Sequence, residues 1–158
     1  MAAVAEIAAA TYASAHPFSL KGTDATCKVV QCHDGDTVHV ALVLFGKVQR
    51  IDCRLDGIDT PEMNVPEQTP AALLARARLL ELCTTCRPAD VAAASTTVQL
   101  QRVLDKNTKL LRIVLGDADK YGRWLAKLFV PETGACVNEI LVQEGLAHRY
   151  DGGTKALW

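Results

Sequence analysis

The sequence predicts an α+β fold that is mainly β, in which a meander of strands packs against helices. Two observations carry this prediction. Apolar residues recur at every second position of 37–45, and the segments 28–33 and 48–55 flank it across turns at Asp34-Gly35-Asp36 and Gly46-Lys47. With 158 residues, the chain is long enough for one domain with its own core.

The predicted third strand, 48–55, separates its charges from its apolar side chains. Its apolar residues share one face: Ile51, Cys53 and Leu55. Its charged residues share the other face and continue past the strand: Arg50, Asp52, Arg54 and Asp56. In the second strand, the face that begins at His39 turns apolar at Val43 and Phe45, so we expect its far end to be covered on both sides. These patterns favour a small barrel or a one-sided sheet.

The sequence also contains signals for helices. Thr69-Pro70 is a typical helix start, and the predicted helix continues to about residue 83. A second amphipathic helix is predicted from about 136 to 144, ended by Gly145. Residues 1–22 are rich in alanine and are expected to form an N-terminal helix or tail, with residues 23–158 as the folded domain.

Between these helices we predict a hairpin, with strands at 98–104 and 109–115 joined by a four-residue loop. A further strand is predicted over 123–130. The segment 87–96 gives no clear signal, and we expect the 87–108 region to add a strand beside the more basic half of the chain.

Charged residues that bear on function lie in three stretches: Asp34-Gly35-Asp36-Thr37, then Arg54 through Asp59-Thr60-Pro61-Glu62, then Asp119-Lys120-Tyr121-Gly122-Arg123. Carboxylates at turns supply the oxygen ligands that a hard divalent cation prefers, and arginine binds a phosphate through two parallel hydrogen bonds. A further carboxylate can accept a proton from water. Metal-assisted cleavage of a phosphodiester needs these groups together.

Each stretch has a simpler interpretation when taken alone. Asp34-Gly35-Asp36 is a turn signal, Arg54 can form a surface ion pair worth about 0–1 kcal/mol, and Glu62 and Arg123 can be solvated loop charges. An EF-hand is excluded because the twelfth position counted from Asp34 is Phe45 rather than glutamate. Only the whole set at these spacings favours a catalytic site.

The three stretches resemble the signature blocks of the staphylococcal nuclease (thermonuclease) family, and 137–147 resembles its late helix. The resemblance covers roughly residues 28–147. It implies a five-stranded OB-type β-barrel with packed helices, and a Ca²⁺-dependent endonuclease that hydrolyses DNA or RNA and leaves 3′-phosphate ends.

The resemblance also implies a role for each site residue. Asp36, Asp59 and the Thr60 carbonyl would bind Ca²⁺, with Asp34 behind them. Arg54 and Arg123 would bind the scissile phosphate, and Glu62 would act as the general base. Substrate contacts are expected from Lys120, Tyr121 and Tyr150.

The chain departs from the family in the long 87–108 segment and in stopping at Trp158, where the family commonly has another helix. We expect the N-terminal alanine-rich helix to cover the surface that this leaves open. Two rival functions remain. One is an inactive module of the same fold that binds nucleic acid or protein; the other is a plain OB-fold binder of single strands, which the aromatic content of 5% disfavours.

The cysteines bear on where the protein works. The chain has six, and the lone Cys83-Thr84-Thr85-Cys86 motif supplies only two of the four ligands of a structural zinc site, so free thiols are expected. Ala13-Ser14-Ala15 resembles a signal-peptidase site, but no basic residue precedes it and Glu6 interrupts the apolar stretch. We therefore expect an intracellular monomer without a membrane segment.

Overall fold

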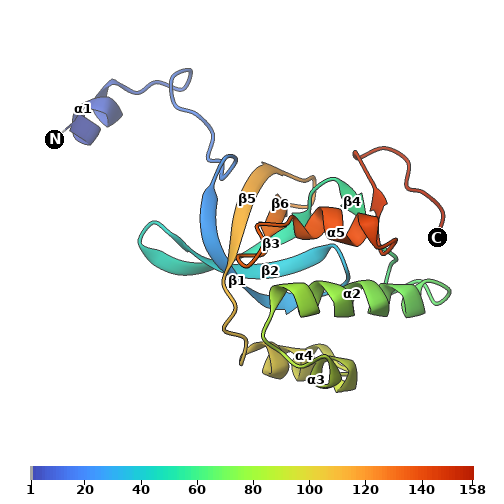
Figure 1. The fold of residues 1–158 in the computed structure, drawn as a ribbon. Coiled ribbons are helices and arrows are strands. Elements are labelled where there is room, and N and C mark those ends of the chain that lie inside the picture. Colours follow the sequence, from blue (N-terminus) through green and yellow to red (C-terminus); the bar gives the residue numbers. More distant parts are fainter. Residues whose placement is uncertain (1) are drawn as a thin grey trace.

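The structure is a computed structural model that describes residues 2–158, and its centre is a closed five-stranded barrel (Figure 1). The barrel strands are β1 (Asp24–Cys32), β2 (Thr37–Leu44), β3 (Lys47–Leu55), β5 (Leu111–Ala118) and β6 (Trp124–Phe129). β1, β2 and β3 form an antiparallel meander, and β6 pairs in parallel with β3. β5 closes the barrel by pairing antiparallel with both β6 and β1. The predicted α+β fold with an OB-type barrel is confirmed.

The barrel is closed around a continuous apolar core. Of the alternate residues predicted to share one face of β2 and β3, all are buried except Leu44 and Ile51, which are partly buried. The fully enclosed residues come from all five strands: Val29, Val38, Val40, Cys53, Leu55, Ile113, Ala126 and Leu128. Burial of apolar surface on this scale is the main favourable term in folding. The core therefore fixes the register of β2 against β3, and this register positions the polar residues at the end of the barrel.

Two predicted helices pack against the barrel. α2 (Thr69–Cys83) buries one face with helical spacing: Ala72, Ala75, Leu79, Leu80 and Cys83. α5 (Val137–Gln143) packs against α2 and β6, and both helices lie on the same side of the barrel in Figure 1. The Asn138 side chain of α5 donates hydrogen bonds to the carbonyls of Asp56 and Ala126 and accepts one from the Leu128 N–H, which fixes this helix on the barrel.

The predicted hairpin over 98–115 is wrong in its first half. Residues 97–104 form the helix α4 (Thr97–Leu104), preceded by a short helix α3 (Pro88–Ala93), so the 87–108 segment adds two helices and no strand. The Thr96 hydroxyl accepts a hydrogen bond from the Gln99 N–H and caps α4, and Leu100 and Leu104 bury one helical face. Four-residue spacing of leucines is a helix pattern that the sequence analysis interpreted as alternation.

The prediction that the N-terminal helix covers part of the folded domain is also wrong. α1 (Ala2–Ala9) is short and buries no side chain, and Figure 1 shows it well away from the barrel. The far end of the β2–β3 hairpin is exposed rather than covered, with Val43 62% and Phe45 77% accessible. Met1 lies outside the described residues, and the division between residues 22 and 23 stays a prediction.

A small second sheet was not predicted. β4 (Ile58–Asp59) pairs antiparallel with β7 (His148–Arg149), which ties the chain after α5 to the segment after β3. Two-residue strands carry no periodicity that a sequence could reveal. Across residues 2–158, no helix has the length and apolar character needed to cross a membrane.

Candidate active site

The first carboxylate of the site is placed by the pairing of β2 with β3. The Asp36 carbonyl accepts a hydrogen bond from the Leu55 N–H at 2.7 Å, and Thr37 lies opposite Arg54 in the strand register. Paired strands lie about 4.8 Å apart. The backbone therefore brings the turn that ends at Asp36 beside the Arg54 side chain.

Arg54 holds the two predicted metal-binding carboxylates together. Its guanidinium donates to Asp36 Oδ1 at 3.4 Å and to Asp59 Oδ1 at 3.0 Å, and it also donates to the Ile58 carbonyl at 3.2 Å. The side chain is 12% exposed, and the two carboxylates are 3% and 2% exposed. One arginine between two buried acids leaves an excess of negative charge, which a further cation would offset.

The surroundings of Asp36 change its pKa. One of its oxygens accepts a hydrogen bond from the Thr60 N–H at 2.9 Å and the other accepts one from the Thr37 hydroxyl at 3.1 Å. Burial, followed by the nearby charge of Asp34, raises the pKa of Asp36 to about 7, although Arg54 and the Thr60 N–H act in the opposite direction.

The turn that carries these acids lies against α2. A Cβ at Gly35 would lie 2.7 Å from the Ala75 Cβ and 2.9 Å from the Thr60 Cγ2. Both distances are shorter than carbon atoms tolerate. Glycine is needed here because the backbone approaches the helix closely, and this approach buries Asp34 and Asp36.

The second arginine comes from the loop between β5 and β6. Asp119 Oδ1 accepts hydrogen bonds from the backbone N–H groups of Tyr121 and Arg123, and its Oδ2 accepts one from Arg123 Nε at 2.8 Å. Burial of Asp119 raises its pKa, but the hydrogen bonds from Arg123 and Tyr121 outweigh burial and hold the pKa below its usual value. Arg123 also reaches the Thr37 hydroxyl at 3.4 Å, which links the loop to the first carboxylate stretch.

A cleft of about 960 Å³ joins these elements. Seven of the predicted site residues line it: Asp34, Arg54, Glu62, Lys120, Tyr121, Arg123 and Tyr150. The other three, Asp36, Asp59 and Thr60, are buried next to Arg54. The Tyr150 ring lies 5.5 Å from the Arg54 guanidinium carbon, and the Tyr121 ring lies 5.4 Å from that of Arg123. The structure therefore brings all the predicted site residues to one end of the barrel.

Three residues at this site were missed by the sequence analysis. Lys155 Nζ lies 2.8 Å from Asp59 Oδ1 and 2.6 Å from Glu62 Oε1. Trp158 Nε1 donates to Asp59 Oδ2 at 3.4 Å, and its ring stacks on His148 with centroids 3.7 Å apart. Lys155 and Trp158 follow the Gly152-Gly153 turn, and His148 lies in a two-residue strand, so no motif or periodicity could have identified any of the three.

Few side chains at this site could hold a metal ion. Within residues 2–158, no cluster of three or more histidine, cysteine, aspartate or glutamate side chains is arranged to hold one. The predicted ligands are the two carboxylates beside Arg54 and the carbonyl of Thr60, and the Thr60 hydroxyl is buried without a hydrogen-bond partner in the described part of the chain.

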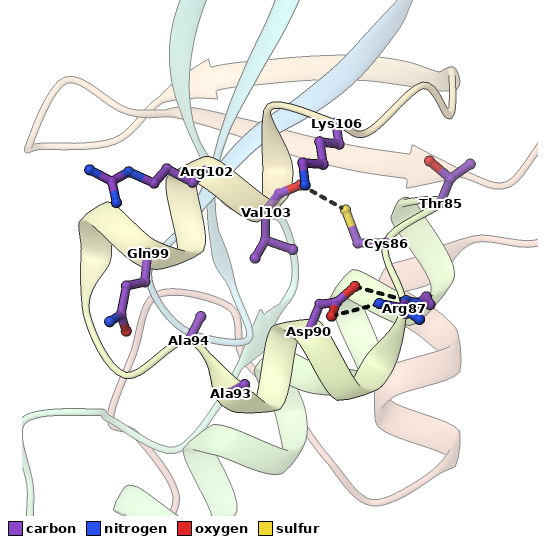
Figure 2. Close-up of a pocket in the computed structure, with 10 residues that line it drawn as sticks. All are labelled: Thr85, Cys86, Arg87, Asp90, Ala93, Ala94, Gln99, Arg102, Val103 and Lys106. Carbon is purple, nitrogen blue, oxygen red and sulfur yellow. Dashed lines mark hydrogen bonds and ion pairs between the residues drawn. The ribbon is translucent and has the colours of Figure 1, made fainter.

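A second hollow, of about 680 Å³, lies between α3 and α4 (Figure 2). Two of its charged groups are paired with each other. Arg87 binds Asp90 through two hydrogen bonds, and the Cys86 thiol donates to the Val103 carbonyl at 3.3 Å. In Figure 2 the Arg102 guanidinium points away from the centre of the hollow. The cleft at the end of the barrel, where the charged groups converge, is the better candidate for function.

Comparison with known proteins identifies the family of the chain. No curated protein matches the chain. The family described as staphylococcal nuclease homologue matches residues 52–156, about two thirds of the chain. The match includes Arg54, Asp59, Glu62 and Arg123 and begins after the Asp34–Asp36 turn. The chain belongs to the staphylococcal nuclease homologue family.

Proposed function

We propose that this protein is a Ca²⁺-dependent nuclease that hydrolyses phosphodiester bonds of DNA, RNA or both and leaves 3′-phosphate ends. The observation that carries the proposal is Arg54, buried between Asp36 and Asp59 at the wall of a cleft that also contains Glu62 and Arg123. Binding modules that do not catalyse a reaction have no need of buried like charges, which destabilise a fold.

The donor set fits a hard cation such as Ca²⁺. It consists of oxygen atoms only: the carboxylates of Asp36 and Asp59 and the carbonyl of Thr60. Ca²⁺ accepts irregular geometry and completes its shell with water, so two carboxylates and one carbonyl suffice. Burial and the nearby charge of Asp34 raise the pKa of Asp36 to about 7, which supports the assignment, because a cation beside this carboxylate would favour its charged form.

Each charged residue then has a role in hydrolysis. Bound Ca²⁺ supplies a positive charge that polarises the phosphate and lowers the pKa of an adjacent water. Glu62, on the loop after β4, accepts a proton from the attacking water. Arg54 and Arg123 exchange their present carboxylate partners for phosphate oxygens and stabilise the negative charge that builds up there. Lys120, Tyr121 and Tyr150 border the same cleft and contact the rest of the nucleic acid.

Cleavage assays test the proposal directly. Single-stranded DNA and RNA are incubated with millimolar Ca²⁺, with Mg²⁺ and with chelator, and the product ends are identified by mass spectrometry. We expect Ca²⁺-dependent cleavage and a loss of about 10²–10³ in rate for Glu62→Gln. Glu67→Gln, an exposed glutamate of the same loop, is the matched control and should cleave at the wild-type rate.

The same assay separates the proposal from its rival, a module that binds nucleic acid or protein without cleaving it. Tight binding without cleavage, indifferent to Ca²⁺ and to Glu62→Gln, would establish the rival. Cleavage that persists in chelator would overturn the metal assignment. Circular dichroism of each variant excludes misfolding as the cause.

A further inference from the structure

The segment 151–158 lies across the candidate active site. Lys155 places its ammonium between Asp59 and Glu62, at 2.8 and 2.6 Å, although these acids lie more than 90 residues away along the chain. The Lys155 ammonium is thus a cation held between the two carboxylates.

Trp158 engages the remaining oxygen of Asp59. The pairing of β4 with β7 puts His148 directly opposite Asp59, and the indole of Trp158 stacks on the His148 ring at an interplanar angle of 2°. This stacking brings the indole N–H to 3.4 Å from Asp59 Oδ2. Arg54 and Lys155 share Oδ1, so both oxygens of a predicted metal ligand are occupied by side chains of the protein itself.

Residues 151–158 make few contacts with the rest of the protein. The segment leaves the protein surface after Tyr150, whose N–H donates to the Gly57 carbonyl at 2.9 Å, and it turns at Gly152 with φ of 97°. Residues 151–158 form no helix or strand, and all of them are exposed. Its contacts with the cleft are concentrated at Lys155 and Trp158, so a competitor at Asp59 removes most of what holds it.

We propose that residues 151–158 form an autoinhibitory strap, in which the Lys155 ammonium takes the place of the metal ion at Asp59 and neutralises Glu62, so that Ca²⁺ must displace the strap to bind. The inference rests on the proposed function, because it takes Asp59 as a metal ligand and Glu62 as the base. The closed strap lowers the apparent Ca²⁺ affinity by the fraction of molecules that are open. The nuclease then needs a higher Ca²⁺ concentration for activity than it would without the strap.

Two readouts other than activity test the strap on the full chain. Calorimetry measures Ca²⁺ affinity, and Trp158 fluorescence measures strap position in a Trp124→Phe background, where Trp158 is the remaining tryptophan. We expect Lys155→Met to raise Ca²⁺ affinity about 10-fold. Trp158→Ala should also raise it, although this change leaves the lysine charge in place. Lys21→Met removes an exposed ion pair with Asp117 and is the control that should change nothing.

The outcomes distinguish the strap from the proposed function. Trp158 emission that changes in step with Ca²⁺ binding supports the strap. Emission that stays constant while calorimetry shows the site filling overturns the strap and leaves the nuclease proposal standing. Higher affinity in Lys155→Met but not in Trp158→Ala overturns it too, because charge alone would then explain the gain. Absence of Ca²⁺ binding in the wild type and in every variant overturns both the metal assignment and the strap.

Discussion

Replacement of Asp36 by asparagine should make the metal-free protein less sensitive to pH. The pKa of Asp36 is raised from 3.8 to about 7, so the native state holds this proton more tightly than the unfolded chain does. The stability that this contributes is complete below the unfolded pKa of 3.8 and is lost as the pH rises through about 7. Wild type should therefore lose stability between pH 5 and pH 8.

The magnitude follows from the part of the shift that lies in this window. About two pKa units lie between pH 5 and 7, and one unit corresponds to about 1.4 kcal/mol, which gives about 3 kcal/mol. Arg54 stays paired with Asp59 in the variant, and an asparagine oxygen can still accept from the Thr60 N–H. The 3.4 Å contact between Arg54 and Asp36 is one of the causes that set the pKa of Asp36, so its loss in the variant is already included in this difference.

Urea unfolding at pH 5, 6, 7 and 8 in the presence of chelator measures the effect. We expect the unfolding free energy of wild type to fall by about 3 kcal/mol more than that of Asp36→Asn over this range. Asp105→Asn, an exposed aspartate on the far end of α4, should follow the wild-type curve. Parallel curves for wild type and Asp36→Asn would refute the claim that this buried carboxylate is strained by its surroundings.

Three further predictions follow from the packing. Gly35→Ala should lower the unfolding free energy by about 1–3 kcal/mol and slow cleavage, because the added Cβ would collide with α2. Gly116→Ala, whose Cβ would have its nearest contact at 3.6 Å, should match wild type, and equal urea midpoints for wild type and both variants would contradict this prediction. Deletion of residues 2–15 should leave the melting temperature unchanged, since α1 buries no side chain, and a drop of several degrees would show that it packs. A thiol reagent should label Cys86 and Cys136 first in the native protein, because the other cysteines are buried, and fast labelling of all six would disprove that.

The barrel strands were predictable because their signal is local. A strand with one face in the core repeats every two residues, and 37–45 and 48–55 keep this period throughout. The helix α4 was missed for the same reason. Val98 and Leu100 follow alternation, whereas Leu100 and Leu104 follow helical spacing, and in the fold Gln101 of the helix donates to the Val30 carbonyl on β1. That contact joins residues 71 positions apart.

The residues of the site were predictable as a set, although their environments were not. Asp36, Arg54 and Asp59 stand in recognisable stretches of sequence, but nothing in those stretches tells that both acids are about 2% exposed or that one guanidinium lies between them. Burial depends on α2 packing against Gly35, which the sequence could not reveal. The raised pKa of Asp36 is a consequence of that packing.

The sequence by itself determined the barrel, its family and the identity of the charged residues at its end, because strand periodicity and short motifs are local properties of a chain. Only the tertiary structure decided that α1 lies apart, that 87–108 is helical, and that Lys155 and Trp158 lie on Asp59. These depend on contacts between segments far apart in sequence, which form only when the core has fixed the relative positions of the strands. A lysine in a glycine-rich stretch comes to contact Asp59 and Glu62 only through that geometry.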